Sequence, residues 1–162
     1  TLAEPTEPMH VRGRALESAA VLSENATVLE AIDIFFDEED TGFRATAIYA
    51  MGRSLQARFL PTILNETSSD DAEIRYEAAR AAGFIGDTEA LPVLSELARD
   101  EDAEVRQAAI NAMGEIGGTA ATRYLRRLAE EASESEIELI EAALEDASIV
   151  SDPLLLEDDD NP

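Results

Sequence analysis

Residues 71–86 decide the fold, and they read Asp-Ala-Glu-Ile-Arg-Tyr-Glu-Ala-Ala-Arg-Ala-Ala-Gly-Phe-Ile-Gly. The pattern returns 31 residues later, at 102–117, where Asp, Arg, Ala and both Gly residues fall in register. A third copy lies 31 residues before the first, with the same residue types at the same positions: Asp40, Arg44, Ala47 and Gly52. A fixed period across three copies predicts a repeat protein.

Each repeat predicts two helices. In the central copy Asp71 is a good N-cap, and Ile74 and Ala78 begin an apolar stripe with helical spacing. Gly83 and Gly86 are expected to end this first helix. The second helix carries Pro in its first turn, where the missing N–H costs nothing. The sequence therefore predicts helical hairpins, with a core that we expect to include Ile74, Ala78, Leu94, Leu97, Val105, Ala109, Ile110, Met113, Ile116 and Leu125.

The whole chain predicts helices and no competing strands. The predicted helices cover residues 11–22, 26–37, 41–52, 57–66, 71–83, 88–99, 102–114, 119–131 and 134–147. The outer copies are weaker, since Ile137 stands where the repeat has Arg and Glu145 where it has Gly. Such degeneracy is expected at the ends of an array, where one side of the repeat faces water.

The predicted fold class is an all-α, right-handed α-solenoid (α-α superhelix) of helical hairpins with a 31-residue period. We expect an N-terminal tail at 1–10, a repeat domain at 11–147 and an acidic C-terminal tail at 148–162. The leucines at 154–156 are candidates to dock on the last helix. Because the chain begins with Thr1, we expect an N-terminal piece to be missing.

Charge and composition exclude several classes of function. The chain has 162 residues, with 36 Asp and Glu against 12 Lys and Arg, and a net charge of -24. This excess of acid repels phosphates, which argues against nucleic acid and anionic membranes as ligands. With no Cys and one His, His10, the sequence predicts neither a bound metal nor another cofactor. We expect a cytoplasmic protein whose acidity reflects a salt-rich cytoplasm, solubility or attraction of a basic partner.

The pattern Asp-x-x-(Ile/Val)-Arg-x-x-Ala-(Ala/Ile)-x-x-(Ala/Met)-Gly-x-Ile-Gly, followed by Ala-Leu-Pro-x-Leu, resembles the short HEAT repeats, in particular those named after the phycocyanobilin lyases. The resemblance covers about residues 11–147. It implies that the Arg-bearing helices line a concave face and the Leu-rich helices lie outside. It also implies an internal, structural ladder in which Arg44, Arg75 and Arg106 pair with Asp40, Asp71 and Asp102.

The concave face supplies the candidate binding site. Its solvent-facing positions come one and five residues after each ladder arginine, because i and i+4 share a helix face. The middle of this stripe contains Tyr49, Tyr76, Arg80, Gln107 and Asn111. Tyr and Arg are enriched in binding hot spots, so we predict a partner-binding surface here. The alternative is an ordinary solvated helix face.

Other charged clusters give weaker predictions. The acidic runs 37–40 and 157–160 have the oxygens that Ca²⁺ prefers but not the spacing of a Ca²⁺ loop, so solvated loops are the favoured interpretation. Arg123, Arg126 and Arg127 form the basic cluster of the chain. They are candidates to bind an acidic partner. The alternative is a solvated helix surface whose positive charge is neutralised by the nearby Glu130 and Glu131.

The sequence thus favours a non-catalytic scaffold or adaptor that binds a protein partner on the concave face, and a partner with a basic surface is one of the open alternatives. The alternative is a bilin lyase subunit or a chaperone-like factor for a cofactor-bearing protein. An iron enzyme built on HEAT repeats requires His-Glu pairs, and here His10 is followed by Val11. The oligomeric state stays open.

Overall fold

The computed structural model describes residues 9–21 and 25–149. These residues form α-helices and two short 3-10 turns, which confirms the predicted all-α solenoid. The predicted helices all occur, with bounds that shift by a few residues. They are α1 Met9–Ala19, α2 Ala26–Phe36, α3 Thr41–Arg53, α4 Leu60–Glu66, α5 Ala72–Ile85, α6 Leu91–Leu97, α7 Ala103–Ile116, α8 Gly118–Ala129 and α9 Glu134–Ile149, with 3-10 turns η1 Ala57–Phe59 before α4 and η2 Thr88–Ala90 before α6.

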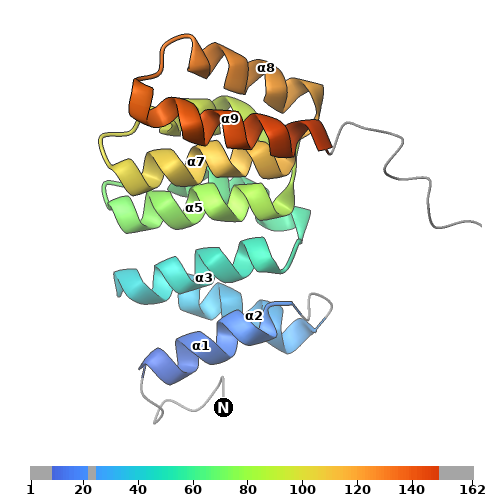
Figure 1. Cartoon of the computed structure of the whole chain (residues 1–162). Helices are drawn as coiled ribbons and strands as arrows, with labels where there is room; N and C mark the ends of the chain where they lie inside the picture. Colours follow the sequence, from blue (N-terminus) through green and yellow to red (C-terminus); the bar gives the residue numbers. More distant parts are fainter. Residues whose placement is uncertain (1–8, 22–24, 150–162) are drawn as a thin grey trace, which may run out of the picture.

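The helices form two layers (Figure 1). Helices α1, α3, α5, α7 and α9 contact one another in that order and make what we call the odd layer. Helices α2, α4, α6 and α8 make the even layer, and each packs against the odd helix that follows it. Every repeat thus contributes one helix to each layer. The predictions for residues 1–8 and 150–162, including the docking of the leucines at 154–156, lie outside the described residues.

The repeated aspartates begin the central odd helices. The Asp71 carboxylate accepts a hydrogen bond from the Glu73 N–H at 2.9 Å. Asp40 caps α3 and Asp102 caps α7 in the same way. A carboxylate at this position satisfies an N–H that has no partner inside the helix, and it also suits the positive end of the helix dipole.

The repeated glycine near the end of α3, α5 and α7 is not a stop signal, which corrects the prediction for Gly83. Helix α5 continues to Ile85, and Gly86 ends it with a φ of 74°. Gly83 is buried against α7, where a Cβ would lie 2.9 Å from the Ala112 Cα. The same holds for Gly52 against Ala81 and for Gly114 against Ala143, with Cβ–Cα distances of 2.5 and 3.1 Å. We call Gly52, Gly83 and Gly114 the notch glycines, because each lets the next odd helix approach closely.

The core lies between the two layers. All ten predicted core residues are buried; Leu97 and Ile116, at 7% exposure, are the most accessible of them. Alanines are frequent among the buried residues of α3, α5 and α7, and the even helices add larger side chains such as Ile63 and Leu125. The N-terminal part of the core contains Leu16 and Phe35, which are also fully buried.

Leu55 departs from the repeat. It follows α3 with a φ of 55°, a left-handed conformation that residues with a Cβ rarely adopt. In the next two repeats glycines stand at this position, Gly86 and Gly117, both with positive φ. The Leu55 side chain is 66% exposed, so no packing compensates for its backbone conformation.

No helix of the described segments is both long and apolar enough to pass through a bilayer.

Candidate protein-binding groove

The ladder arginines pair with partners other than those predicted. Arg75 forms a two-pronged ion pair with Asp100, with both N–O distances at 2.8 Å, and its Nη1 donates to the Ser69 and Asp70 carbonyls. Arg44 pairs with Glu66 at 2.8 Å and Arg106 with Glu136 at 3.3 Å. The predicted pairing with Asp40, Asp71 and Asp102 is wrong because these carboxylates cap their own helices.

Each of these ion pairs joins an odd helix to a later segment of the chain: Arg44 to α4, Arg75 to the loop after α6 and Arg106 to α9. The Arg75–Asp100 pair is largely enclosed, with side chains 11% and 10% exposed. The hydrogen bond from Arg75 holds the pKa of Asp100 below its usual value. Since Arg75 also satisfies two loop carbonyls, it fixes the loop before α5 against the loop that follows α6.

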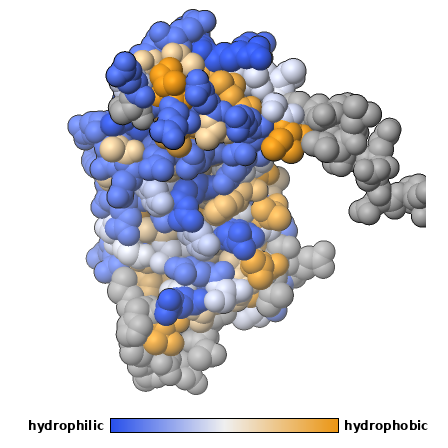
Figure 2. Space-filling model, viewed as in Figure 1, coloured by the Kyte–Doolittle hydropathy of each residue, from blue (hydrophilic) through white to orange (hydrophobic). Residues whose placement is uncertain are grey.

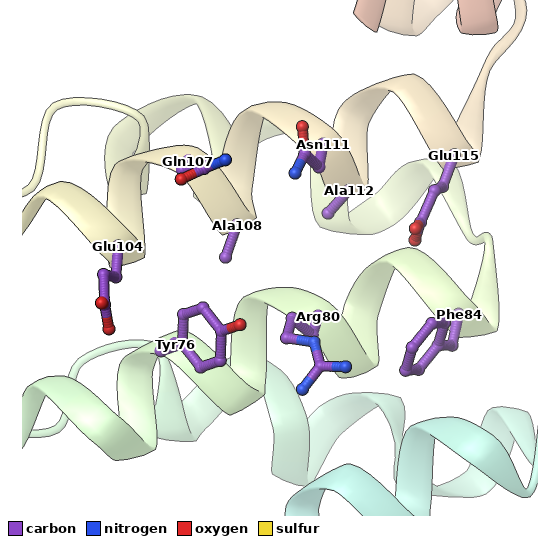
Figure 3. A pocket seen from close by; sticks show the side chains of 9 residues that line it. All are labelled: Tyr76, Arg80, Phe84, Glu104, Gln107, Ala108, Asn111, Ala112 and Glu115. Carbon is purple, nitrogen blue, oxygen red and sulfur yellow. The ribbon is translucent and has the colours of Figure 1, made fainter. Parts of the chain in front are cut away.

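The predicted binding residues lie on the open side of the odd layer. Tyr76 and Arg80 from α5 and Gln107 and Asn111 from α7 line one hollow of about 390 Å³, shown in Figure 3. Tyr49 from α3 lines a second hollow of about 310 Å³. Arg80 lines both, so the two hollows are adjacent and lie on either side of this side chain. We call the two hollows together the groove; it extends over α1, α3, α5 and α7 and is lined by Glu17, Gly42, Ala45, Thr46, Tyr49, Glu73, Tyr76, Glu77, Arg80, Phe84, Glu104, Gln107, Ala108, Asn111, Ala112 and Glu115.

Arg80 lies at the centre of a group of aromatic rings. Its guanidinium carbon is 5.0 Å from the Tyr49 ring centroid, 5.4 Å from that of Tyr76 and 5.7 Å from that of Phe84. Tyr49 and Phe84 also meet edge to face, with centroids 6.0 Å apart. Arg80 Nη1 donates to the Glu77 carboxylate at 3.1 Å. These contacts hold Arg80 in one orientation and connect α3 to α5 across the groove.

Carboxylates surround these rings. Glu104 and Glu115 come from α7, and in Figure 3 the Glu115 side chain reaches toward α5. Burial raises the pKa of Glu77, and the charges of Glu73 and Glu17 raise it further against the attraction of Arg80. Burial likewise raises the pKa of Glu115. Figure 2 shows that hydrophilic residues cover most of the visible face of the molecule, with apolar residues in separate patches.

The sequence prediction missed the acidic lining of the groove and its third ring. Phe84 and Glu115 lie four residues after Arg80 and Asn111, one helical turn further along the stripe used for the prediction. Extending the stripe by that turn finds both. Glu77 and Glu104 precede Arg80 and Gln107 by three residues, so the i, i+3 relation, which the prediction did not use, also places them beside the stripe.

The other predicted charged clusters lie elsewhere. The side chains at 37–40 are exposed, and Asp40 is a helix cap. Within residues 9–21 and 25–149 there is no group of three or more acidic or His side chains placed to hold a metal ion. The run 157–160 is outside the described part. Arg123, Arg126 and Arg127 are exposed on α8, in the even layer and away from the groove.

Comparison with known proteins identifies the repeat. The sequence profile of the HEAT repeats matches residues 60–145, which is more than half of the chain. The chain belongs to the HEAT-repeat family. HEAT repeats generally mediate protein–protein interactions. In this chain the notch glycines lie where successive odd helices pack closely.

A solved structure supports the same fold. The crystal structure of an engineered protein superposes with a TM-score of 0.59 and 20% sequence identity, covering 91% of this chain and 77% of that one. At this identity the likeness concerns the fold alone. No curated protein matches the chain.

Proposed function

We propose that this HEAT-repeat chain is a non-catalytic scaffold or adaptor that holds a protein partner in the groove. One observation carries the proposal: Arg80 and three aromatic rings, Tyr49, Tyr76 and Phe84, meet on an open helix face. Tyr and Arg combine large contact area with directional hydrogen bonds, and they dominate binding hot spots.

The position of the groove supports the same function. It crosses helices from successive repeats, so a segment lying in it contacts several repeats at once. The exposed amides of Gln107 and Asn111 offer donors and acceptors for the backbone of such a segment. Because Arg80 is already fixed by Glu77 and the rings, little side-chain entropy is lost when a partner binds.

Affinity capture from the native lysate tests the proposal. The wild-type chain is compared with a groove variant carrying Tyr49→Ala, Tyr76→Ala and Arg80→Ala, and bound proteins are identified by mass spectrometry. We expect the wild type to retain a partner that the groove variant loses, with affinity for the purified partner reduced at least about tenfold, or ~1.4 kcal/mol.

A matched control replaces three exposed side chains of the even layer: Arg123→Ala, Arg126→Ala and Arg127→Ala. This control should retain the partner, and circular dichroism should show that both variants remain folded. If the groove variant holds the partner as well as the wild type does, the groove is not the binding site. Loss only in the control would place the site on α8. The bilin lyase alternative stays a prediction of the sequence resemblance.

A further inference from the structure

We propose that the groove takes a basic, extended segment of the partner protein, whose cationic side chains lie against the carboxylates and rings of the groove. The inference rests on the proposed function, because it names the chemistry of the partner at the same site.

The charge of the groove is the first argument. Five carboxylates and one arginine line it: Glu17, Glu73, Glu77, Glu104, Glu115 and Arg80. Arg80 already pairs with Glu77 at 3.1 Å, so four carboxylates remain for a cation from outside. The net charge of -24 on the whole chain adds a long-range field of the same sign. Such a field accelerates the approach of a basic segment and repels an acidic one.

The carboxylates also repel one another. Glu77, whose pKa burial raises, carries additional repulsion from Glu73 and Glu17. Asp146 has the same effect on Glu115. A partner cation placed among these groups relieves the repulsion, whereas an anion increases it. The groove therefore has an excess of negative charge that a basic side chain of the partner neutralises.

Arg80 shows how the groove accommodates a guanidinium. A carboxylate from Glu77 binds its N–H, and aromatic rings lie within 6 Å of its carbon atom. Each hollow offers the same combination again. Tyr76 and Glu104, both labelled in Figure 3, line one hollow, and Tyr49 and Glu73 line the other. Carboxylate and ring together favour Arg or Lys over neutral side chains.

The width of the groove sets the length of the segment. Its lining runs from Glu17 on α1 across α3 and α5 to Asn111 on α7. Packed helices lie about 8–10 Å apart, so three such steps cover about 24–30 Å. An extended chain advances about 3.3 Å per residue, so about eight residues cross the groove.

The test uses a fluorescein-labelled octapeptide of alternating Arg and Ser, with an octapeptide of alternating Glu and Ser as its acidic counterpart. Binding is measured by fluorescence anisotropy near physiological salt. Three proteins are compared: the wild type, a groove variant with Glu104→Gln and Glu115→Gln, and a control with Glu138→Gln and Glu141→Gln on the exposed side of α9. Both variants change the net charge by the same amount, so they separate the groove from the general field.

We expect the basic peptide to bind the wild type and the control within about twofold of each other, and the groove variant at least tenfold more weakly. Equal weakening in both variants would show that the general field alone attracts the peptide, and it would overturn the inference. Equal or tighter binding of the acidic peptide would overturn it as well.

Binding of the natural partner to the two groove variants distinguishes a failure of this inference from a failure of the proposed function. A partner that is lost by the Tyr49, Tyr76 and Arg80 variant but held fully by Glu104→Gln with Glu115→Gln leaves the groove as a binding site and refutes a basic occupant. A partner that both groove variants lose, together with selective binding of the basic peptide, supports both.

Discussion

At the scale of single residues, Leu55 carries a local strain that the neighbouring repeats avoid. Its φ of 55° requires the left-handed conformation that Gly86 and Gly117 adopt freely at the same position. For a residue with a Cβ this conformation costs about 1–2 kcal/mol. The exposed Leu55 side chain gains little from packing, so the fold tolerates the strain without local compensation.

We therefore predict that Leu55→Gly raises the free energy of unfolding. The relief of strain, about 1–2 kcal/mol, exceeds the extra chain entropy that glycine loses, about 0.5–1 kcal/mol. The expected gain is about 0.5–1 kcal/mol, measured by urea denaturation. Leu55→Ala is the control, because it removes the side chain and keeps the Cβ. Equal stabilities for the Gly and Ala variants would show that backbone strain at this site is negligible.

For single residues, interactions within one helical turn are predictable from the sequence, whereas ion-pair partners far apart in the chain are not. The caps at Asp40, Asp71 and Asp102 follow from chemistry within a single turn, but the resemblance to HEAT repeats also paired these carboxylates with the ladder arginines. The true partners, such as Asp100 for Arg75, lie about one repeat further along the chain. Only the packing of the repeats decides between two carboxylates that both suit an arginine.

At the scale of helices, the notch glycines control how the odd helices pack. A Cβ on Gly52 would lie 2.5 Å from the Cα of Ala81, which is backbone and cannot turn away. Gly13 provides the contrast within the same layer, because a Cβ there would meet only the Thr46 side chain at 3.6 Å, an ordinary contact. Gly52 is thus required for the close packing of two helices, whereas Gly13 is not.

We predict that Gly52→Ala lowers the free energy of unfolding by about 2 kcal/mol, since the forced separation of α3 and α5 outweighs the helix propensity of alanine. Gly13→Ala should instead raise it by about 0.5–1 kcal/mol through that same propensity. Thermal unfolding of both variants beside the wild type measures the difference. Stabilisation by Gly52→Ala would show that α3 and α5 separate at little cost.

Helices and their order are predictable from the sequence because apolar spacing repeats every turn, whereas the function of a glycine is ambiguous. Gly83 and Gly86 look alike in the sequence, and both suit a helix end. Only the position of Ala112 on the neighbouring helix shows that Gly83 allows close packing and Gly86 ends α5. The stripe that contains Tyr76 and Arg80 is predictable for the same periodic reason. Glu77 and Glu104, three residues before Arg80 and Gln107, are predictable from the same spacing, although the predicted site left them out.

At the scale of the whole molecule, the carboxylates act in two opposite ways on stability. Glu77 and Glu115 have raised pKa values in the folded chain, so their charged forms destabilise it at neutral pH. Asp100 and Glu136 have lowered pKa values, so their charged forms stabilise it. The first effect disappears as pH falls from neutral through the raised pKa values toward the ordinary Glu value of about 4.3. The second is lost only below about pH 4, as pH falls through the lowered values.

We predict a free energy of unfolding that rises from pH 7 to about pH 5 and falls again toward pH 3. Relief of general repulsion at a net charge of -24 adds to the rise. Urea denaturation at these three pH values measures it, since urea adds no ionic screening. Glu77→Gln should make the rise smaller. The exposed Glu138→Gln, which changes the net charge by the same amount, should reduce the rise by less than Glu77→Gln does. A steady fall from pH 7 to pH 5 would contradict the assignment of raised pKa values.

The buried contact at Gly83 also affects the shape of the proposed binding groove. The absence of one methyl group there fixes how closely α7 approaches α5, and thereby how far Gln107 and Asn111 stand from Tyr76 and Arg80. The missing Cβ of Gly83 thus helps to set the spacing between the two helices that line the groove. If the groove binds a partner as proposed, its specificity depends partly on a buried position that the partner does not contact, and a substitution there changes the groove while every exposed side chain stays the same.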